Sequence, residues 1–108
     1  MTYTVRLTPK VSILMPLYNG ENFLMEAVKS VLAQSERDFE LLIGDNGSTD
    51  TSRSLLAALG DPRVRVFLND RNYGIFGNLN LLRHHATAPL IHFPWRMSLP
   101  TLRRIRKW

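Results

Sequence analysis

The 108-residue sequence predicts an α/β fold with a parallel sheet between two helical layers, a three-layer α/β/α arrangement. Short apolar runs bounded by turn-forming residues alternate with segments of helical apolar spacing, in the order β-α-β-α-β-α-β. Such alternation is typical of parallel strands joined by right-handed crossovers. No internal repeat or low-complexity linker interrupts the pattern, and the length suits one domain.

The first expected strand covers residues 11–15 and is closed by Pro16. A loop follows, in which Asn19 and Asn22 are both candidate N-caps for the next helix. The apolar residues of that helix recur at helical spacing and predict one buried stripe. They are Phe23, Leu24, Ala27, Val28, Val31 and Leu32.

The second expected strand, residues 39–43, stops at Gly44 and is followed by a lone carboxylate, Asp45, and a turn at Asn46-Gly47. Asparagine and glycine at this point also allow a hairpin. However, residues 54–59 follow helical rather than strand preference, which favours a helix reaching about residue 59. Three residues can accept hydrogen bonds from the first N–H groups of that helix. They are Ser48, Thr49 and Asp50.

The second half of the chain continues the alternation. Residues 64–68 predict a strand with one partly wetted face, and residues 69–74 a turn-rich loop. A third helix over residues 76–85 is expected to point three apolar side chains inward, and a fourth strand over residues 90–93 to follow it. The three side chains are Phe76, Leu79 and Leu82.

The formal net charge of +5 lies entirely in the last segment of the chain. Residues 1–95 carry nine Lys or Arg and nine Asp or Glu, whereas residues 96–108 carry five basic residues and no acid. We therefore expect two parts, a body over residues 1–95 and a basic tail over residues 96–108. The neutral body gives no support for nucleic-acid binding.

Two further features of the sequence bear on the cellular location of the protein. The sequence has no cysteine, which excludes disulfides and cysteine-based metal sites. It shows no signal-peptide block at its start and no apolar run long enough to span a bilayer. A cytoplasmic location is therefore expected.

Polar side chains follow the carboxyl ends of three predicted strands: Tyr18 and Asn19, then Asp45, then residues 72–80. Because parallel strands end on one rim, where open α/β sheets bind ligands, we expect these side chains to converge. Asp45 is the first polar side chain past its strand and is expected to face the crevice. Such a rim could hold a nucleotide. Each of these residues, taken alone, is better explained as a hydrogen-bonding partner for the loop backbone. The three loops taken together favour a ligand-binding site.

Other common site types find little support. His84 and His85 are adjacent on a predicted helix and point about a hundred degrees apart, so they do not form the usual same-face metal pair. His92 lies in a predicted strand and is expected to be a packed or rim residue. The first strand is not followed by Gly-x-Gly-x-x-Gly, and there is no Gly-Lys-Ser/Thr loop, so the dinucleotide-binding and P-loop interpretations lack their main motif.

Several linked motifs resemble the start of a family-2 glycosyltransferase. They are VSILMPLYN at 11–19, SVLAQ at 30–34, FELLIGDNGSTD at 39–50, NDRNYG at 69–74 and GNLN at 77–80. They follow the family's order and spacing over about residues 10–93. The resemblance implies the N-terminal, nucleotide-sugar-binding portion of a truncated, Rossmann-like GT-A domain.

The resemblance also implies a nucleotide-diphosphate sugar as donor and glycosyl transfer to an acceptor that the sequence does not identify. In the family, the positions matching 16–19 and Asp45 hold the base and ribose, and those matching 72–80 lie near the diphosphate and sugar. Asn46 stands where the family often has a second Asp, and its amide can still cap or hydrogen-bond. The nucleotide-sugar contacts implied here are Pro16, Leu17, Tyr18, Asn19, Asp45, Asn46, Asn72, Gly74 and Asn80.

The pattern departs from the family after the fourth strand. There the family places an acidic cluster that holds a divalent cation, Mg or Mn, and further on its catalytic base. Here Phe93 is followed by PWRMS, and no acid occurs after Asp70. We therefore expect neither metal ligands nor a catalytic residue in this chain, and catalysis to be incomplete.

Residues 96–108 admit two interpretations. The abrupt loss of the family pattern favours an accidental sequence after a truncation or frameshift near residue 93. Alternatively, Leu102, Ile105 and Trp108 recur among basic residues as in a segment that binds an anionic membrane surface. The chain would then be a non-catalytic nucleotide-binding module with a weak contact at the inner face of a membrane. The first interpretation is preferred, because so short a helix is marginal alone.

Overall fold

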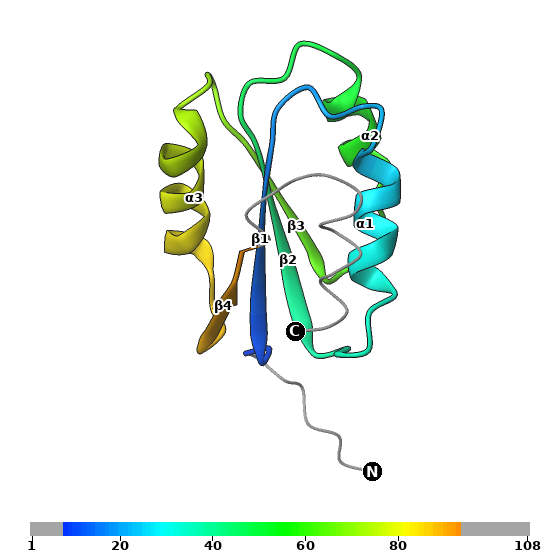
Figure 1. The fold of residues 1–108 in the computed structure, drawn as a ribbon, viewed down its shortest axis with the longest axis vertical. Coiled ribbons are helices and arrows are strands. Elements are labelled where there is room, and N and C mark those ends of the chain that lie inside the picture. Colours follow the sequence, from blue (N-terminus) through cyan, green and yellow to red (C-terminus); the bar gives the residue numbers. More distant parts are fainter. Residues whose placement is uncertain (1–7, 94–108) are drawn as a thin grey trace.

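The computed structural model describes residues 8–93, in which four strands and three helices alternate in the predicted order (Figure 1). The expectations for the basic tail, residues 96–108, lie outside the described residues. The elements are β1 (Val11–Leu17), α1 (Leu24–Leu32), β2 (Phe39–Asp45), α2 (Ser52–Ala57), β3 (Val64–Leu68), α3 (Gly74–His85) and β4 (Leu90–His92).

The strands form one parallel sheet in the order β3-β2-β1-β4. Helices α1 and α2 cover one face of the sheet and α3 covers the other, which confirms the predicted three-layer arrangement (Figure 1). Strands β1 and β2 are paired over their whole length, from Val11 opposite Phe39 to Leu17 opposite Asp45. This register brings the carboxyl ends of the two central strands side by side.

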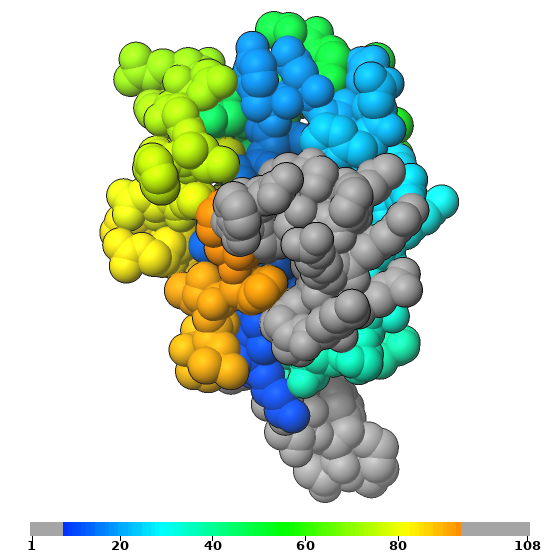
Figure 2. Space-filling view, viewed as in Figure 1, coloured from blue at the N-terminus to red at the C-terminus, as the bar shows by residue number. Residues whose placement is uncertain are grey.

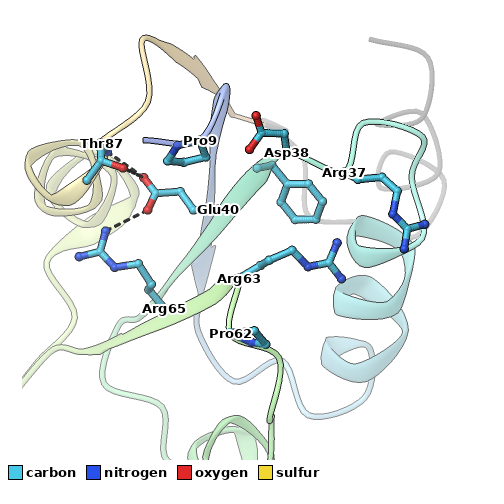
Figure 3. A pocket seen from close by; sticks show the side chains of 9 residues that line it. Pro9, Arg37, Asp38, Glu40, Pro62, Arg63, Arg65 and Thr87 are labelled. Atoms are coloured by element: carbon cyan, nitrogen blue, oxygen red, sulfur yellow. Dashed lines mark hydrogen bonds and ion pairs between the residues drawn. The ribbon is translucent and has the colours of Figure 1, made fainter. Parts of the chain in front are cut away.

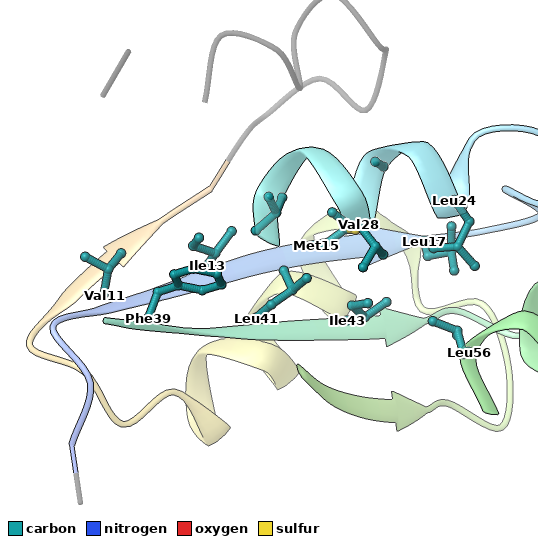
Figure 4. Close-up of a cluster of buried hydrophobic side chains, with 12 residues drawn as sticks. Val11, Ile13, Met15, Leu17, Leu24, Val28, Phe39, Leu41, Ile43 and Leu56 are labelled. Atoms are coloured by element: carbon teal, nitrogen blue, oxygen red, sulfur yellow. The ribbon is translucent and has the colours of Figure 1, made fainter. Parts of the chain in front are cut away.

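A large apolar core fills the space between the sheet and helices α1 and α2 (Figure 4). Alternate residues of the two central strands face it, because successive side chains of a strand point to opposite faces. The predicted stripe of α1 faces the same core, with Phe23 and Leu32 partly buried at its border. The fully packed members are Val11, Ile13, Met15, Leu17, Leu24, Ala27, Val28, Val31, Phe39, Leu41, Ile43 and Leu56.

A smaller core lies on the other face, where α3 packs on the sheet through Leu82 against Leu14 and Leu42. Gly44 allows α3 to approach closely, since a Cβ atom there would collide with the side chain of Asn78. The Asn78 Nδ2 instead donates to the carbonyl oxygen of Gly44 at 2.8 Å. The end of β2 is thereby tied to α3.

Both central strands extend two residues beyond their predicted ends, to Leu17 and Asp45. The expectation that Pro16 closes β1 was therefore wrong. The oxygen of Leu17 accepts from the Asn46 amide on the β2 side, so the nitrogen of Pro16 faces the other side of the strand. There β4 pairs only with Val11–Ile13, and a proline costs no ladder hydrogen bond.

The helix ends also differ from the prediction. The N-cap position of α1 is Phe23, which makes no side-chain cap bond, so neither Asn19 nor Asn22 caps this helix. The carbonyl oxygen of Gly20 accepts from the amides of Phe23 and Leu24 instead. Helix α2 begins after Thr51 and ends at Ala57, two residues earlier than expected.

Phe76 does not point inward, and 82% of it is exposed. The fully buried side chains of α3 are Asn78 and Leu82, and Leu79 packs partly buried against the smaller core as predicted. A residue two positions before Asn78 lies on the opposite side of the helix. Strand β3 shows partial burial from Val64 to Phe67 without the predicted alternation, because it is an edge strand. Strand β4 ends at His92 rather than at residue 93.

At the amino end of the sheet, the buried carboxylate of Glu40 joins three strands and the segment before β4 (Figure 3). Its Oε2 accepts from the Ser12 hydroxyl at 2.6 Å and from the Thr87 amide at 2.7 Å and hydroxyl at 2.9 Å. Its Oε1 accepts from Arg65 Nη1 at 3.0 Å. Burial alone would raise the pKa of Glu40, but these hydrogen bonds outweigh it and lower the pKa below the usual 4.5.

Replacing Glu40 with glutamine is expected to lower the free energy of unfolding at neutral pH by about 2 kcal/mol, because charge-assisted hydrogen bonds are lost. Since the folded-state pKa is lowered, the stabilisation is full above pH 4.5 and is lost as the pH falls through the folded-state value. The free energies of unfolding of wild type and Glu40→Gln, measured by urea titration, should therefore approach each other as the pH falls from about 7 to about 3. Glu26→Gln, on the exposed side of α1, is the control. A difference in the free energy of unfolding between the two proteins that stays unchanged at low pH would contradict this account.

Candidate functional site

Three loops meet at the carboxyl end of the sheet, at the top of Figure 1. They follow β1, β2 and β3 and cover residues 18–23, 46–51 and 69–73. The Asn46 amide donates to the oxygen of Leu17 at 2.8 Å, and the Asn69 amide donates to the oxygen of Asp45 at 2.9 Å. These backbone bonds join the three strand ends, so the predicted convergence of the loops is confirmed.

A hollow of about 230 Å³ opens between the β1–α1 loop and the first turn of α3. Figure 2 shows these two segments, blue and yellow-green, on either side of the opening. One wall is apolar and aromatic, and the other carries side-chain amides. The lining residues are Pro16, Leu17, Tyr18, Phe23, Asn46, Asn72, Ile75 and Asn78. Such a site can hold a flat ring with a hydrogen-bonding edge.

The carboxylate of Asp45 lies beneath the rim and is fully buried. Its Oδ1 accepts from the Ser48 hydroxyl at 2.5 Å, and its Oδ2 accepts from the Ser48 amide at 3.2 Å and from Arg53 Nε at 2.7 Å. The expectation that Asp45 faces an open crevice was therefore wrong. The turn after β2 folds back over the carboxylate, helped by Gly47 with its φ of 83°.

The side-chain amide of Asn46 is buried and uses all of its hydrogen-bonding groups within the protein. Its Nδ2 donates to Asn72 Oδ1 at 2.8 Å and to the oxygen of Gly74 at 3.2 Å. Its Oδ1 accepts from Asn69 Nδ2 at 3.1 Å and from the Tyr73 amide at 3.0 Å. Asn46 therefore fastens the β3–α3 loop to the end of β2.

Asn69 and Asn78 extend this network and were not among the residues predicted for the site. Asn69 Nδ2 also donates to Asn78 Oδ1 at 3.1 Å. A signal for Asn78 was present in the sequence, since it lies four residues before Leu82 on the inward side of α3. A polar residue at a buried helical position requires a hydrogen-bonding partner.

Asn19 joins the β1–α1 loop to the β2–α2 loop. Its φ is 48°, in the left-handed region that asparagine tolerates better than most residues. Its Oδ1 accepts from the amides of Thr49 at 2.8 Å and Asp50 at 3.3 Å, while its own amide donates to Ser48 Oγ at 2.8 Å. Asp50 Oδ1 accepts from the Ser52 amide at 2.9 Å, so of the three expected caps Asp50 serves the first turn of α2.

Gly74 lies at the rim, but Asn80 does not line the hollow. Gly74 begins α3, and its amide donates to Asn72 Oδ1 at 2.8 Å. Asn80 is exposed further along the helix, where its Oδ1 accepts from Arg83 Nη2 at 3.2 Å. It lines a separate hollow beside β4, together with Leu14, Phe76, Leu79, Arg83, Ile91 and Phe93.

Residues 8–93 contain no group of three or more His, Cys, Asp or Glu side chains placed to hold a metal ion. The ring of His85 stacks on Phe67 with a centroid distance of 4.4 Å, and burial lowers the pKa of His92. At the rim, Asp70 accepts from the Tyr73 hydroxyl, and Asp45 is held by Ser48 and Arg53. The described residues therefore do not fit the divalent cation that the resemblance implies.

A family model described as glycosyl transferase family 2 matches residues 12–93. The chain belongs to this family. WfgD of Escherichia coli, a UDP-Glc:alpha-D-GlcNAc-diphosphoundecaprenol beta-1,3-glucosyltransferase, is 34% identical over 83 residues, covering 77% of this chain and 33% of WfgD. The GalNAc(5)-diNAcBac-PP-undecaprenol beta-1,3-glucosyltransferase of Campylobacter jejuni is 34% identical over 89 residues, covering 79% of this chain and 28% of that protein.

The fold is similar to that of the mannosyltransferase PcManGT from Pyrobaculum calidifontis, solved in complex with GDP-Man and Mn2+. The TM-score is 0.71 at 23% identity, over 78% of this chain and 26% of that chain. The predicted GT-A fold is thereby confirmed. This family-2 chain spans about a third or less of the length of the curated relatives it matches. None of the helices in residues 8–93 has the length and apolar character needed to cross a bilayer.

Replacing Asn46 with aspartate, the residue the family often has there, is expected to lower the free energy of unfolding by about 2 kcal/mol. The change removes both Nδ2 donors and places a carboxylate oxygen beside Asn72 Oδ1 and the oxygen of Gly74. Urea titration measures the loss, with Asn80→Asp on the exposed side of α3 as control. An Asn46→Asp variant as stable as wild type would show that the β3–α3 loop does not depend on this amide.

Proposed function

We propose that this chain is the nucleotide-binding part of a family-2 glycosyltransferase and that its rim holds the nucleotide of a nucleotide-diphosphate sugar. The reaction it serves is glycosyl transfer to an acceptor whose identity stays open. The observation that carries this proposal is the hollow at the carboxyl ends of β1 and β2, where an exposed aromatic ring faces side-chain amides.

The base stacks on Tyr18, which is half exposed at the mouth of the hollow and free to present its ring. Asn72 supplies a donor to the edge of the base, because its Nδ2 makes no hydrogen bond within the described residues. Pro16 and Leu17 form the apolar floor. Asn19 and Gly74 stabilise the conformation of the loops around the hollow.

Asp45 contributes its Oδ1 to the nucleotide. In the structure this oxygen accepts from the Ser48 hydroxyl, and the serine side chain can turn to another staggered rotamer, giving up its hydrogen bond from the Asn19 amide as it does so. An N–H or O–H group of the base or ribose takes the place of that hydroxyl. The backbone of the 46–48 turn can stay in place during this exchange, because only one side-chain torsion changes.

The proposal is limited to binding by the described residues. PcManGT was solved in complex with GDP-Man and Mn2+, and a divalent cation, Mg or Mn, is the companion we propose for the diphosphate. Residues 8–93 do not provide a fitting ligand set, so no catalytic step is assigned to this chain.

Tyr18→Ala is expected to weaken nucleotide binding about tenfold, because stacking of a base on an aromatic ring contributes about 1–3 kcal/mol. Isothermal titration with uridine diphosphate and guanosine diphosphate measures the affinity of the whole chain. Phe76→Ala is the matched control, since Phe76 is also an exposed aromatic residue but lies outside the hollow. It should leave the dissociation constant within about twofold.

Two results would count against the proposal. One is a wild-type chain, shown to be folded by circular dichroism, that binds neither nucleotide. The other is equal weakening by Tyr18→Ala and Phe76→Ala, which would mean that the hollow is not the place where the base lies.

A further inference from the structure

Arg53 connects the buried carboxylate at the rim to the next loop of the sheet. Its Nε donates to Asp45 Oδ2 at 2.7 Å, and its Nη2 donates to the backbone oxygen of Asn69 at 2.5 Å. The two bonds use adjacent donors of one planar guanidinium, so they fix the direction of the carboxylate relative to the β3–α3 loop. No motif in the sequence marks Arg53, which lies in the first turn of α2.

The two oxygens of Asp45 have different kinds of partner. Oδ1 accepts from a hydroxyl that can rotate away, whereas Oδ2 accepts weakly from the Ser48 amide at 3.2 Å and strongly from Arg53, whose other end is anchored on Asn69. When a ligand takes the place of Ser48 at Oδ1, Arg53 keeps the carboxylate from turning with it. A fixed carboxylate binds a ligand donor more tightly, because less rotational freedom is lost on binding.

We propose that Arg53 is a positioning residue for nucleotide recognition. It does not touch the nucleotide, and it acts by holding Asp45 in the orientation that the base or ribose requires. This inference rests on the proposed function, in which Asp45 is a nucleotide contact.

The alternative is an ion pair that only stabilises the fold. Arg53 is 39% exposed but the Asp45 carboxylate is fully buried, so losing this ion pair also lowers the stability of the fold. Arg63 offers a matched comparison, because its Nε and Nη2 donate to Asp61 at 3.0 and 2.8 Å in the same forked manner. Its side chain is 28% exposed, and the pair lies at the opposite, amino end of β3.

The experiment compares Arg53→Gln, Arg53→Lys and Arg63→Gln in the whole chain. Binding of uridine diphosphate and guanosine diphosphate is measured by isothermal titration, and stability without ligand by thermal unfolding. Arg53→Gln should weaken binding about tenfold or more, the effect of losing a charge-assisted hydrogen bond. Arg53→Lys should recover part of the affinity, because lysine keeps the charge but reaches only one of the two acceptors. Arg63→Gln should leave the dissociation constant unchanged, even where it lowers the melting temperature.

Equal dissociation constants for wild type and Arg53→Gln would overturn the inference, and so would equal weakening by Arg53→Gln and Arg63→Gln. Asp45→Asn separates this failure from failure of the proposed function. If Asp45→Asn loses binding while Arg53→Gln keeps it, the proposed nucleotide site is supported and the proposed role of Arg53 is rejected. If Asp45→Asn binds as wild type does, Asp45 is not a nucleotide contact, and both the proposed role of Asp45 and that of Arg53 fall.

Discussion

The rim of this chain depends on the side-chain amide of Asn46. Backbone pairing alone brings the strand ends together, but it does not fix the loop that leads from β3 into α3. The amide does so with two donated and two accepted hydrogen bonds, all made from a buried position at the end of β2. Because Asn72 and Gly74 are held in this way, the first turn of α3 stands at a defined distance from Tyr18, and the hollow between them keeps its shape.

The same amide explains how the chain can do without the second aspartate often found in its family. A carboxylate offers only acceptors, whereas two of the four partners of Asn46 are themselves oxygen atoms that need a donor. The substitution therefore fits a β3–α3 loop rich in asparagine, in which Asn69 and Asn78 continue the network. Residues that depart from a family pattern can thus be understood from their neighbours, and here the departure concerns how the loop is held.

The strand and helix order, the parallel sheet and the stripe of α1 could be predicted from the sequence, because apolar periodicity and turn residues report which side of an element is buried. The same reasoning failed for side chains whose placement depends on particular side-chain hydrogen bonds. Asp45 was expected at an open crevice, but Ser48 and Arg53 enclose it. Phe76 was expected in the core, but the polar residue Asn78 takes the inward side of α3, since Gly44 leaves room for it on β2. Ser48 and Arg53 lie three and eight positions from Asp45, and Asn78 lies 34 positions from Gly44, and none of these side-chain pairings leaves a periodic trace in one sequence.

Strand β2 carries a buried carboxylate near each end, Glu40 and Asp45, and each is paired with an arginine from another element. The two carboxylates differ in whether their hydrogen-bond partners can be exchanged. Two of the hydrogen bonds to Glu40 come from the Thr87 amide and from Arg65, which also donates to a backbone oxygen, so Glu40 locks the amino end of the sheet. Asp45 instead has one partner, the Ser48 hydroxyl, that leaves when the serine side chain rotates and gives up its hydrogen bond from the Asn19 amide. A carboxylate held firmly on one oxygen and exchangeable on the other is suited to receive a ligand, and this asymmetry, more than its position after β2, is why we propose Asp45 as a binding group.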